Sequence, residues 1–178
     1  MIRWAALLLA GIAGSALAQF GSYPRQEQSR YDEDAEKPWV EAAVDLPAYP
    51  AEENLREFYV SAAASNKFYI DASTLAVGAD GAVRYALVVK ATGGATNVSF
   101  EGIHCKNRSW KHYATGRSDG AWVKSPASRA DWRPIENRPV NRHHAALSRD
   151  YFCPGGIPIN SAEEGRNALR LGRHPNAI

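Results

Sequence analysis

The stretch from Val83 to Cys105 constrains the fold of this 178-residue chain more than any other. Its sequence, VRYALVVKATGGATNVSFEGIHC, contains two segments of alternating apolar character that are separated by Gly93 and Gly94. A period of two is typical of a β-strand, and a glycine pair between two such segments is typical of a hairpin turn. The stretch therefore predicts an antiparallel β-hairpin.

The residues before this hairpin predict a short additional strand, and their apolar pattern predicts its register. A three-residue loop over 79–81 places Leu75 and Val77 on the same face as the apolar residues of 83–87, whereas a two-residue loop places them on the opposite face. A one-residue slip moves every side chain to the other face, so the apolar match favours the three-residue loop. That loop needs Gly81 in a left-handed conformation, which glycine adopts without steric cost.

The same reasoning at the second turn predicts a four-residue loop over 92–95, which pairs Leu87 with Phe100 on one apolar face. The opposite face then carries three polar candidates for contact with a ligand: Arg84, Asn97 and Glu101. In this register Glu101 lies within reach of Arg84 for a cross-strand ion pair. The alternative is a purely structural ion pair beneath a covering helix or loop, which is common on half-covered sheets.

The rest of the chain predicts strands followed by helices. Alternating segments predict strands over 55–61, 67–71 and 109–115, and the proline-rich segment before them predicts an extended arm over the domain. A helix is expected over 142–152, and a second one runs from the capping residue Ser161 to Leu171. We therefore expect an α+β fold: a twisted antiparallel sheet of four or five strands with C-terminal helices and one disulfide.

The two cysteines of the chain, Cys105 and Cys153, predict that disulfide. An even number of cysteines in an oxidising compartment is usually paired, and no CxxC spacing favours a redox-active pair. In the chain-entropy description a loop of this length contributes roughly 4 kcal/mol to the free energy of unfolding.

The N-terminus predicts export. A short basic start, an apolar run and the sequence Ala16-Leu17-Ala18 are typical of a signal peptide over 1–18, cleaved between Ala18 and Gln19. The apolar run is too short to span a bilayer, so no transmembrane segment is expected in the mature chain. Because Gln19 stands where lipid attachment would need a cysteine, no lipid anchor is expected. Residues 19–37 are polar and predict a mobile tail, and 38–178 predict a single globular domain.

The sequence contains no motif that demands a particular chemistry. No histidine pair has the HxxxH or HExxH spacing of a metal site, and the adjacent His143 and His144 are expected to point in different directions on a helix. Phosphate-binding and nucleophile motifs are also missing, so we predict no metal, no cofactor and no catalytic residue. Basic residues exceed acidic ones in 101–178 but form no dense run, so no nucleic-acid partner is expected.

Several separate segments, in order, resemble the cryptic neisserial protein-like family, a group of small exported proteobacterial proteins of uncharacterised function. They are WVEAAVDLP (39–47), FYID (68–71), DGAVRYALVVKATGGATNVSFEGIHC (80–105) and DYFC (150–153). The resemblance covers most of 38–153 and implies a periplasmic or outer-membrane-associated location. Some relatives are envelope lipoproteins, from which Gln19 departs. The family offers no catalytic residues to transfer to this chain.

These observations predict a periplasmic protein, in solution or peripheral at the outer membrane, with a binding or structural role toward an envelope protein or glycan. The alternative is an enzyme that acts on an envelope glycan through Arg84 and Glu101. An open pocket lined by Arg84, Asn97 and Glu101 would favour the enzyme, whereas a covered sheet face would exclude it. Four aromatic residues suit sugar stacking as well as core filling: Trp110, Tyr113, Trp122 and Trp132.

Overall fold

The computed structural model describes residues 38–138 and 142–178, and Trp39–Ile178 form one structural unit. The predicted signal peptide with its cleavage site at Ala18 and Gln19, and the predicted tail over 19–37, lie outside the described residues. The described strands are β1 (Leu55–Phe58), β2 (Lys67–Asp71), β3 (Ala76–Val77), β4 (Val83–Lys90), β5 (Thr96–His104), β6 (Ser109–Gly116), β7 (Trp122–Lys124) and β8 (Arg133–Pro134). The described helical segments are η2 (Glu52–Asn54), η3 (Ala127–Arg129), α1 (Arg142–Ala146), η5 (Leu147–Phe152), η6 (Pro154–Gly156) and α2 (Ala162–Leu171).

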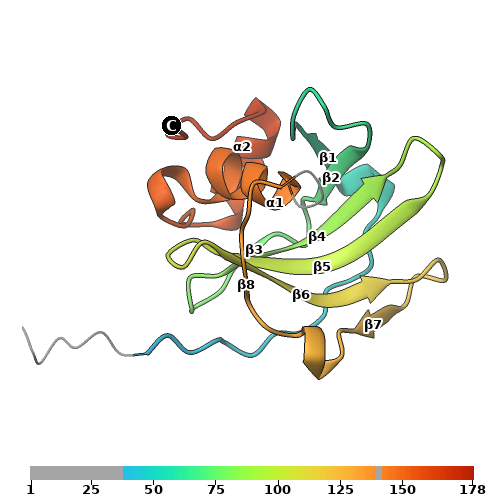
Figure 1. The fold of residues 1–178 in the computed structure, drawn as a ribbon, viewed down its shortest axis with the longest axis horizontal. Helices are drawn as coiled ribbons and strands as arrows, with labels where there is room; N and C mark the ends of the chain where they lie inside the picture. Colours follow the sequence, from blue (N-terminus) through green and yellow to red (C-terminus); the bar gives the residue numbers. More distant parts are fainter. Residues whose placement is uncertain (1–37, 139–141) are drawn as a thin grey trace, which may run out of the picture. The chain divides into compact units, whose positions relative to one another are not determined.

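All the strands belong to one antiparallel sheet in the order β1-β2-β4-β5-β6-β7, with β3 beside β4 and β8 beside β6 (Figure 1). The α+β class and the antiparallel pairing are as predicted. The sheet has eight strands in the described part of the chain, more than the four or five expected. The strands β7 and β8, which the sequence did not predict, span only three and two residues, too few for an alternating pattern to stand out.

The predicted register at the first turn is confirmed. Val77 pairs with Val83, the N–H of Gly78 donates to the carbonyl of Ala82 at 2.9 Å, and Gly81 has a φ of 75°. The three-residue loop over 79–81 therefore forms as expected, with its glycine in the left-handed region.

The predicted register at the second turn is wrong by one residue. The loop again has three residues, over 92–94, because Gly94 adopts a φ of 87° and Ala91 pairs with Ala95. As a result Glu101 lies opposite Tyr85, and Arg84 lies opposite Gly102. Arg84 and Glu101 are therefore on opposite faces of the sheet, and the predicted ion pair between them does not form.

Helical segments cover one face of the sheet (Figure 1). The helix predicted over 142–152 is an α-helical turn, α1, that continues as the π-helical segment η5. Helix α2 begins after Ser161, whose Oγ accepts the N–H of Glu164 at 3.2 Å, and ends at Gly172 with a φ of 77°, as predicted. The largest buried apolar side chains between these segments and the sheet are Ile70, Tyr85, Leu87, Ile103, Leu147, Tyr151, Phe152 and Ile159.

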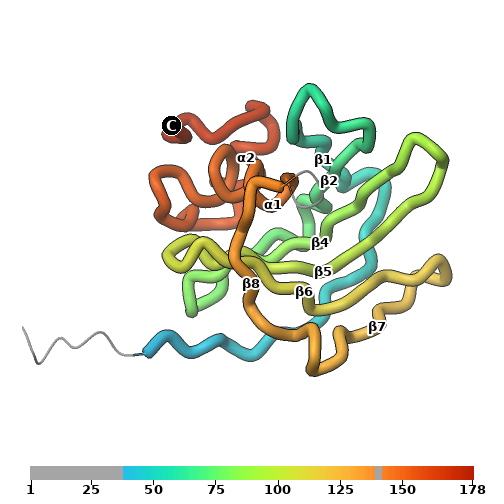
Figure 2. Tube along the Cα trace, in the orientation of Figure 1, coloured from blue at the N-terminus to red at the C-terminus, as the bar shows by residue number. Residues whose placement is uncertain are grey.

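The N-terminal arm and the connections around β7 and β8 cover the other face (Figure 2). The indole Nε1 of Trp39 donates to the carbonyl of Asp80 at 2.7 Å, and its ring packs against Trp132. Farther along the arm, the ring of Tyr49 packs against Trp122. The expectation of an extended arm packed over the domain is therefore met, and neither face of the sheet is left open.

The predicted disulfide is present. Cys105, just after β5, bonds to Cys153, just after η5, with a Cα–Cα distance of 5.5 Å. It joins the sheet covalently to the helical layer. Among residues 38–138 and 142–178, no helix is both long enough and apolar enough to cross a membrane.

Candidate functional site

Arg84, the first of the three predicted ligand-facing residues, belongs to a buried structural network. Its guanidinium donates two parallel hydrogen bonds to the Asp80 carboxylate, at 2.9 and 2.6 Å, and both side chains are under 8 % exposed. Burial raises the pKa of Asp80, but Arg84 and the N–H groups of Ala42 and Ala82 outweigh it and hold that pKa below its usual range. Arg84 thus anchors the turn at Asp80 beneath the arm.

The network continues into the arm itself. The Nε of Arg84 donates to the hydroxyl of Tyr113 at 3.2 Å, and that hydroxyl donates to Glu41 at 2.8 Å. Lys111 completes the chain of contacts with a 2.6 Å ion pair to Glu41. Every charged member therefore has a partner of opposite charge, and the structural reading of Arg84 fits these contacts. Arg84 and Glu101 lie on opposite faces of the sheet, so the two side chains do not share one site.

Asn97, the second candidate, lines a pocket of about 490 Å³ on the helical side of the sheet. The pocket lies between the connection from β1 to β2, the adjoining ends of β4 and β5, and the first residues of α1. Its lining is mixed: apolar Val60, Phe68 and Val89 alternate with polar Ser61, Asn66, Asn97, Arg142 and His143. Such a lining suits a small ligand that has both polar and apolar parts.

Glu101, the third candidate, is buried on the same face as Asn97, near this pocket. One carboxylate oxygen lies 2.8 Å from Nε2 of His144, and the other accepts the hydroxyl of Ser99 at 2.8 Å. Burial raises the pKa of Glu101, but His144, His143 and the Ser99 hydroxyl outweigh it and lower it to about 2. The carboxylate is therefore ionised at neutral pH. Nδ1 of His144 is buried and has no hydrogen-bond partner within the described residues.

His143 and His144 do not point in different directions as expected but lie side by side, with ring centroids 4.0 Å apart. They form the middle of a row of four rings: Phe68 of β2, His143, His144 and Trp110 of β6. The outer ring centroids are 5.4 Å from His143 and 3.8 Å from His144, respectively. The rings at each end hold both imidazoles over the sheet.

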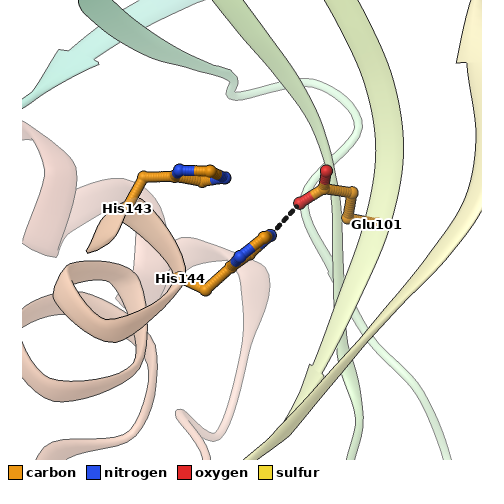
Figure 3. A group of neighbouring side chains, drawn as sticks. All are labelled: Glu101, His143 and His144. Atoms are coloured by element: carbon orange, nitrogen blue, oxygen red, sulfur yellow. Dashed lines mark hydrogen bonds and ion pairs between the residues drawn. The ribbon is translucent and has the colours of Figure 1, made fainter. Parts of the chain in front are cut away.

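Glu101, His143 and His144 therefore converge on one point. Figure 3 shows both imidazoles extending from α1 toward the carboxylate on β5. One donor atom from each residue lies within 4.8 Å of the others, close enough for the group to hold a metal ion. Burial, followed by the neighbouring His144, lowers the pKa of His143 to about 4, which keeps its ring neutral at neutral pH. We name this group the HHE cluster; no spacing rule in the sequence would have found it.

The fold and the site define a small disulfide-bonded α+β protein whose sheet is covered on both faces and carries a polar cluster beside a pocket. Residues 34–170 match the CNP1-like family, and the chain belongs to that family. No curated protein and no solved structure matches the chain.

Proposed function

We propose that this chain is an exported protein of the cell envelope, periplasmic or peripheral at the outer membrane, that acts as a binding module. Two observations support export: the signal-peptide pattern over 1–18 and the Cys105–Cys153 disulfide, a bond that persists in oxidising compartments. The family resemblance found in the sequence agrees with that location. A covered sheet without a paired Arg84 and Glu101 favours binding over the enzyme alternative.

The pocket beside Asn97 is the observation that carries the binding role. At about 490 Å³ it falls within the usual size range of small-molecule sites. Arg142 lines it and donates one hydrogen bond, from its NH1 nitrogen to the hydroxyl of Ser61 at 3.3 Å. Its Nε is buried and has no hydrogen-bond partner in the described part of the chain. Because Arg142 makes one hydrogen bond and no ion pair among the described residues, its guanidinium favours an anionic group on the ligand.

The ligand that fits this lining best is an acidic fragment of an envelope glycan. Sugar hydroxyls would bond to the amides of Asn66 and Asn97, a carboxylate would bond to Arg142, and the apolar ring face would lie on Val60 and Phe68. All of these side chains line the same pocket. An envelope protein, the other predicted type of partner, would not need a pocket of this size.

A titration with muropeptides tests the pocket, because these peptidoglycan fragments carry both sugar hydroxyls and carboxylates. Backbone amide signals of 60–66 and Asn97 should shift in heteronuclear NMR spectra. Arg142→Gln should weaken binding by about 10-fold or more, because charge-assisted hydrogen bonds contribute about 1.5–3 kcal/mol. Arg138→Gln is the control, since Arg138 is exposed, pairs with Glu136 and does not line the pocket. Equal affinities of the two variants, or shifts confined to another surface, would contradict the proposal.

The export half of the proposal has a separate test. Mass spectrometry of the protein recovered from the producing cell should show a mature start at Gln19 or at its cyclised form. A mature pool that retains Met1 would contradict cleavage, whatever the muropeptide titration shows.

A further inference from the structure

We infer that the HHE cluster, formed by Glu101, His143 and His144, binds a divalent transition-metal ion such as Zn²⁺. The first support is the convergence of three ligand-type atoms from two separate elements, β5 and α1. A tetrahedral zinc ion with bonds of about 2.0–2.1 Å places its ligand atoms about 3.3 Å apart. The Glu101 oxygen and the His144 nitrogen are already 2.8 Å apart, and the whole group lies within 4.8 Å. Metal binding would displace the proton shared by Glu101 and His144, move these two atoms apart by about 0.5 Å, and bring in the His143 nitrogen by rotation of its ring.

The second support is that His143 has no competing partner. It makes ring contacts with Phe68 and His144 but no hydrogen bond to another described residue. A half-buried imidazole beside a buried carboxylate would ordinarily be expected to bond to it or to a neighbouring polar group. The freedom of its ring nitrogens leaves a lone pair for a metal ion, while Phe68 limits where the ring can turn.

The third support is the surroundings that position the other two ligands. The hydroxyl of Ser99 fixes the Glu101 carboxylate, and stacking on Trp110 fixes the ring of His144. Outer contacts of this kind orient metal ligands and strengthen binding. The ligands are thus largely preorganised before the ion arrives.

The donor set determines the class of ion. Two imidazole nitrogens and one carboxylate oxygen suit Zn²⁺, Ni²⁺ and Cu²⁺, whereas Ca²⁺ and Mg²⁺ prefer sites built from oxygen alone. Three protein ligands leave at least one coordination position for water or for another molecule. Because His143 also lines the pocket of about 490 Å³, that position is within reach of whatever the pocket holds. The metal site does not depend on the pocket's organic ligand.

Calorimetric titration of ZnCl₂ into the metal-stripped full chain, purified without a histidine tag, tests the inference. We expect one ion per chain, and we expect Ca²⁺ in excess not to compete. His143→Gln should weaken binding by about 10-fold or more, the range seen when a metal site loses a supporting group. His143 is only half buried, so this variant should fold, which circular dichroism verifies.

A second His–Glu pair in the chain supplies the matched control. His174 lies 2.9 Å from Glu164, but that pair has no neighbouring second histidine, so Glu164→Gln should leave Zn²⁺ affinity within about 2-fold. Visible absorption of bound Co²⁺ provides an independent readout: the four-ligand spectrum of the wild type should be lost in His143→Gln and kept in Glu164→Gln. Affinity weaker than about 100 μM in the wild type, or equal binding by His143→Gln, would overturn the inference.

Discussion

At the residue scale, two aspartates occupy the same position of the same kind of turn and have different surroundings. Asp80 and Asp119 are each the middle residue of a three-residue loop, and each accepts the N–H two residues ahead. Asp119 pairs with Arg117 in the open, where both side chains are over half exposed. Asp80 is 2 % exposed and pairs with the buried Arg84. The contribution of the carboxylate to stability therefore depends on whether its ion pair is buried, and not on the geometry of the turn.

Asp80→Asn should lower the free energy of unfolding by about 3 kcal/mol, because it leaves the buried Arg84 without its counter-charge. Urea-induced unfolding measures the change. Asp119→Asn keeps the turn geometry and loses only an exposed pair, so its effect should stay within about 0.5 kcal/mol. Similar losses in both variants would mean that the turn, and not the buried pair, is the source of the stability.

The same carboxylate predicts a pH dependence. The pKa of Asp80 in the folded protein lies below its unfolded value of about 3.9, so its contribution is complete above that pH. It is lost progressively as the pH falls from about 4 toward the lower folded value. Unfolding free energies measured from pH 5 to pH 2 should therefore decline more steeply for the wild type than for Asp80→Asn. Parallel curves would contradict the assignment.

Arg84 also marks a limit of sequence reasoning at this scale. The sequence does not predict its pairing with Asp80, four positions earlier, because Asp80 lies within a predicted turn. The sequence instead predicts Glu101 as the partner of Arg84, through a register that differs by one residue from the one formed. The residue types indicated that Arg84 forms an ion pair. Which acidic residue it pairs with depends on the face of the sheet that each side chain occupies.

At the element scale, one turn geometry recurs in three hairpins. Gly81, Gly94 and Gly120 each end a three-residue loop with φ between 75° and 87°. The strand register at the first turn could be predicted, because only one of the two loop lengths places the apolar residues of both strands on the same face. The second could not, because β4 and β5 are buried on both faces and apolar residues occur on both. Alternation alone then fails to separate two registers.

Replacing the two glycines of the second turn separately tests this geometry. Gly94→Ala should cost about 1–2 kcal/mol, because its φ of 87° is strained for any residue with a Cβ atom. Gly93→Ala should be neutral or stabilising by about 0.5 kcal/mol, since it has ordinary φ and open space around its Cβ direction. Thermal unfolding of both variants gives the comparison. A larger loss of stability for Gly93→Ala than for Gly94→Ala would mean that Gly93, and not Gly94, adopts the left-handed conformation.

The first C-terminal helix shows why the HHE cluster escaped prediction. The sequence correctly indicated a helix near 142–152, but it gave no sign of the change to a π-helical segment at Leu147. The direction of the two imidazoles is set by Phe68 and Trp110, which come from strands far away in the sequence. Helical spacing describes one element at a time, whereas this cluster exists only between elements.

At the scale of the whole molecule, the sheet is the middle layer between two coverings of different kinds. The apolar core lies between the sheet and the helical layer, whereas the arm on the other face supplies ion pairs and stacked aromatic rings. The class of fold and the disulfide were predictable because they follow from long strands, helix caps and a cysteine count. The short strands β7 and β8 depend on pairing with β6 and carry too little sequence pattern to be predicted.

Replacing both Cys105 and Cys153 by serine should lower the free energy of unfolding by about 2–5 kcal/mol, the usual cost of removing a native disulfide. Chemical denaturation measures it, and the wild type under reducing conditions should behave like the double variant. Peptide mapping without reductant should recover the linked pair. Two free thiols in the native protein would contradict the bond.

The bond between Cys105 and Cys153 also makes 48 successive peptide links part of a covalent ring. Strands β6, β7 and β8 and helix α1, with both histidines of the HHE cluster, lie on that ring, and Glu101 lies just outside it. A single backbone cut in the exposed turn at Gly120 would open the ring without dividing the molecule. On a denaturing gel the nicked protein would still migrate as one species until the disulfide was reduced. His143 and His144 would remain covalently linked to the part of the chain that carries Glu101.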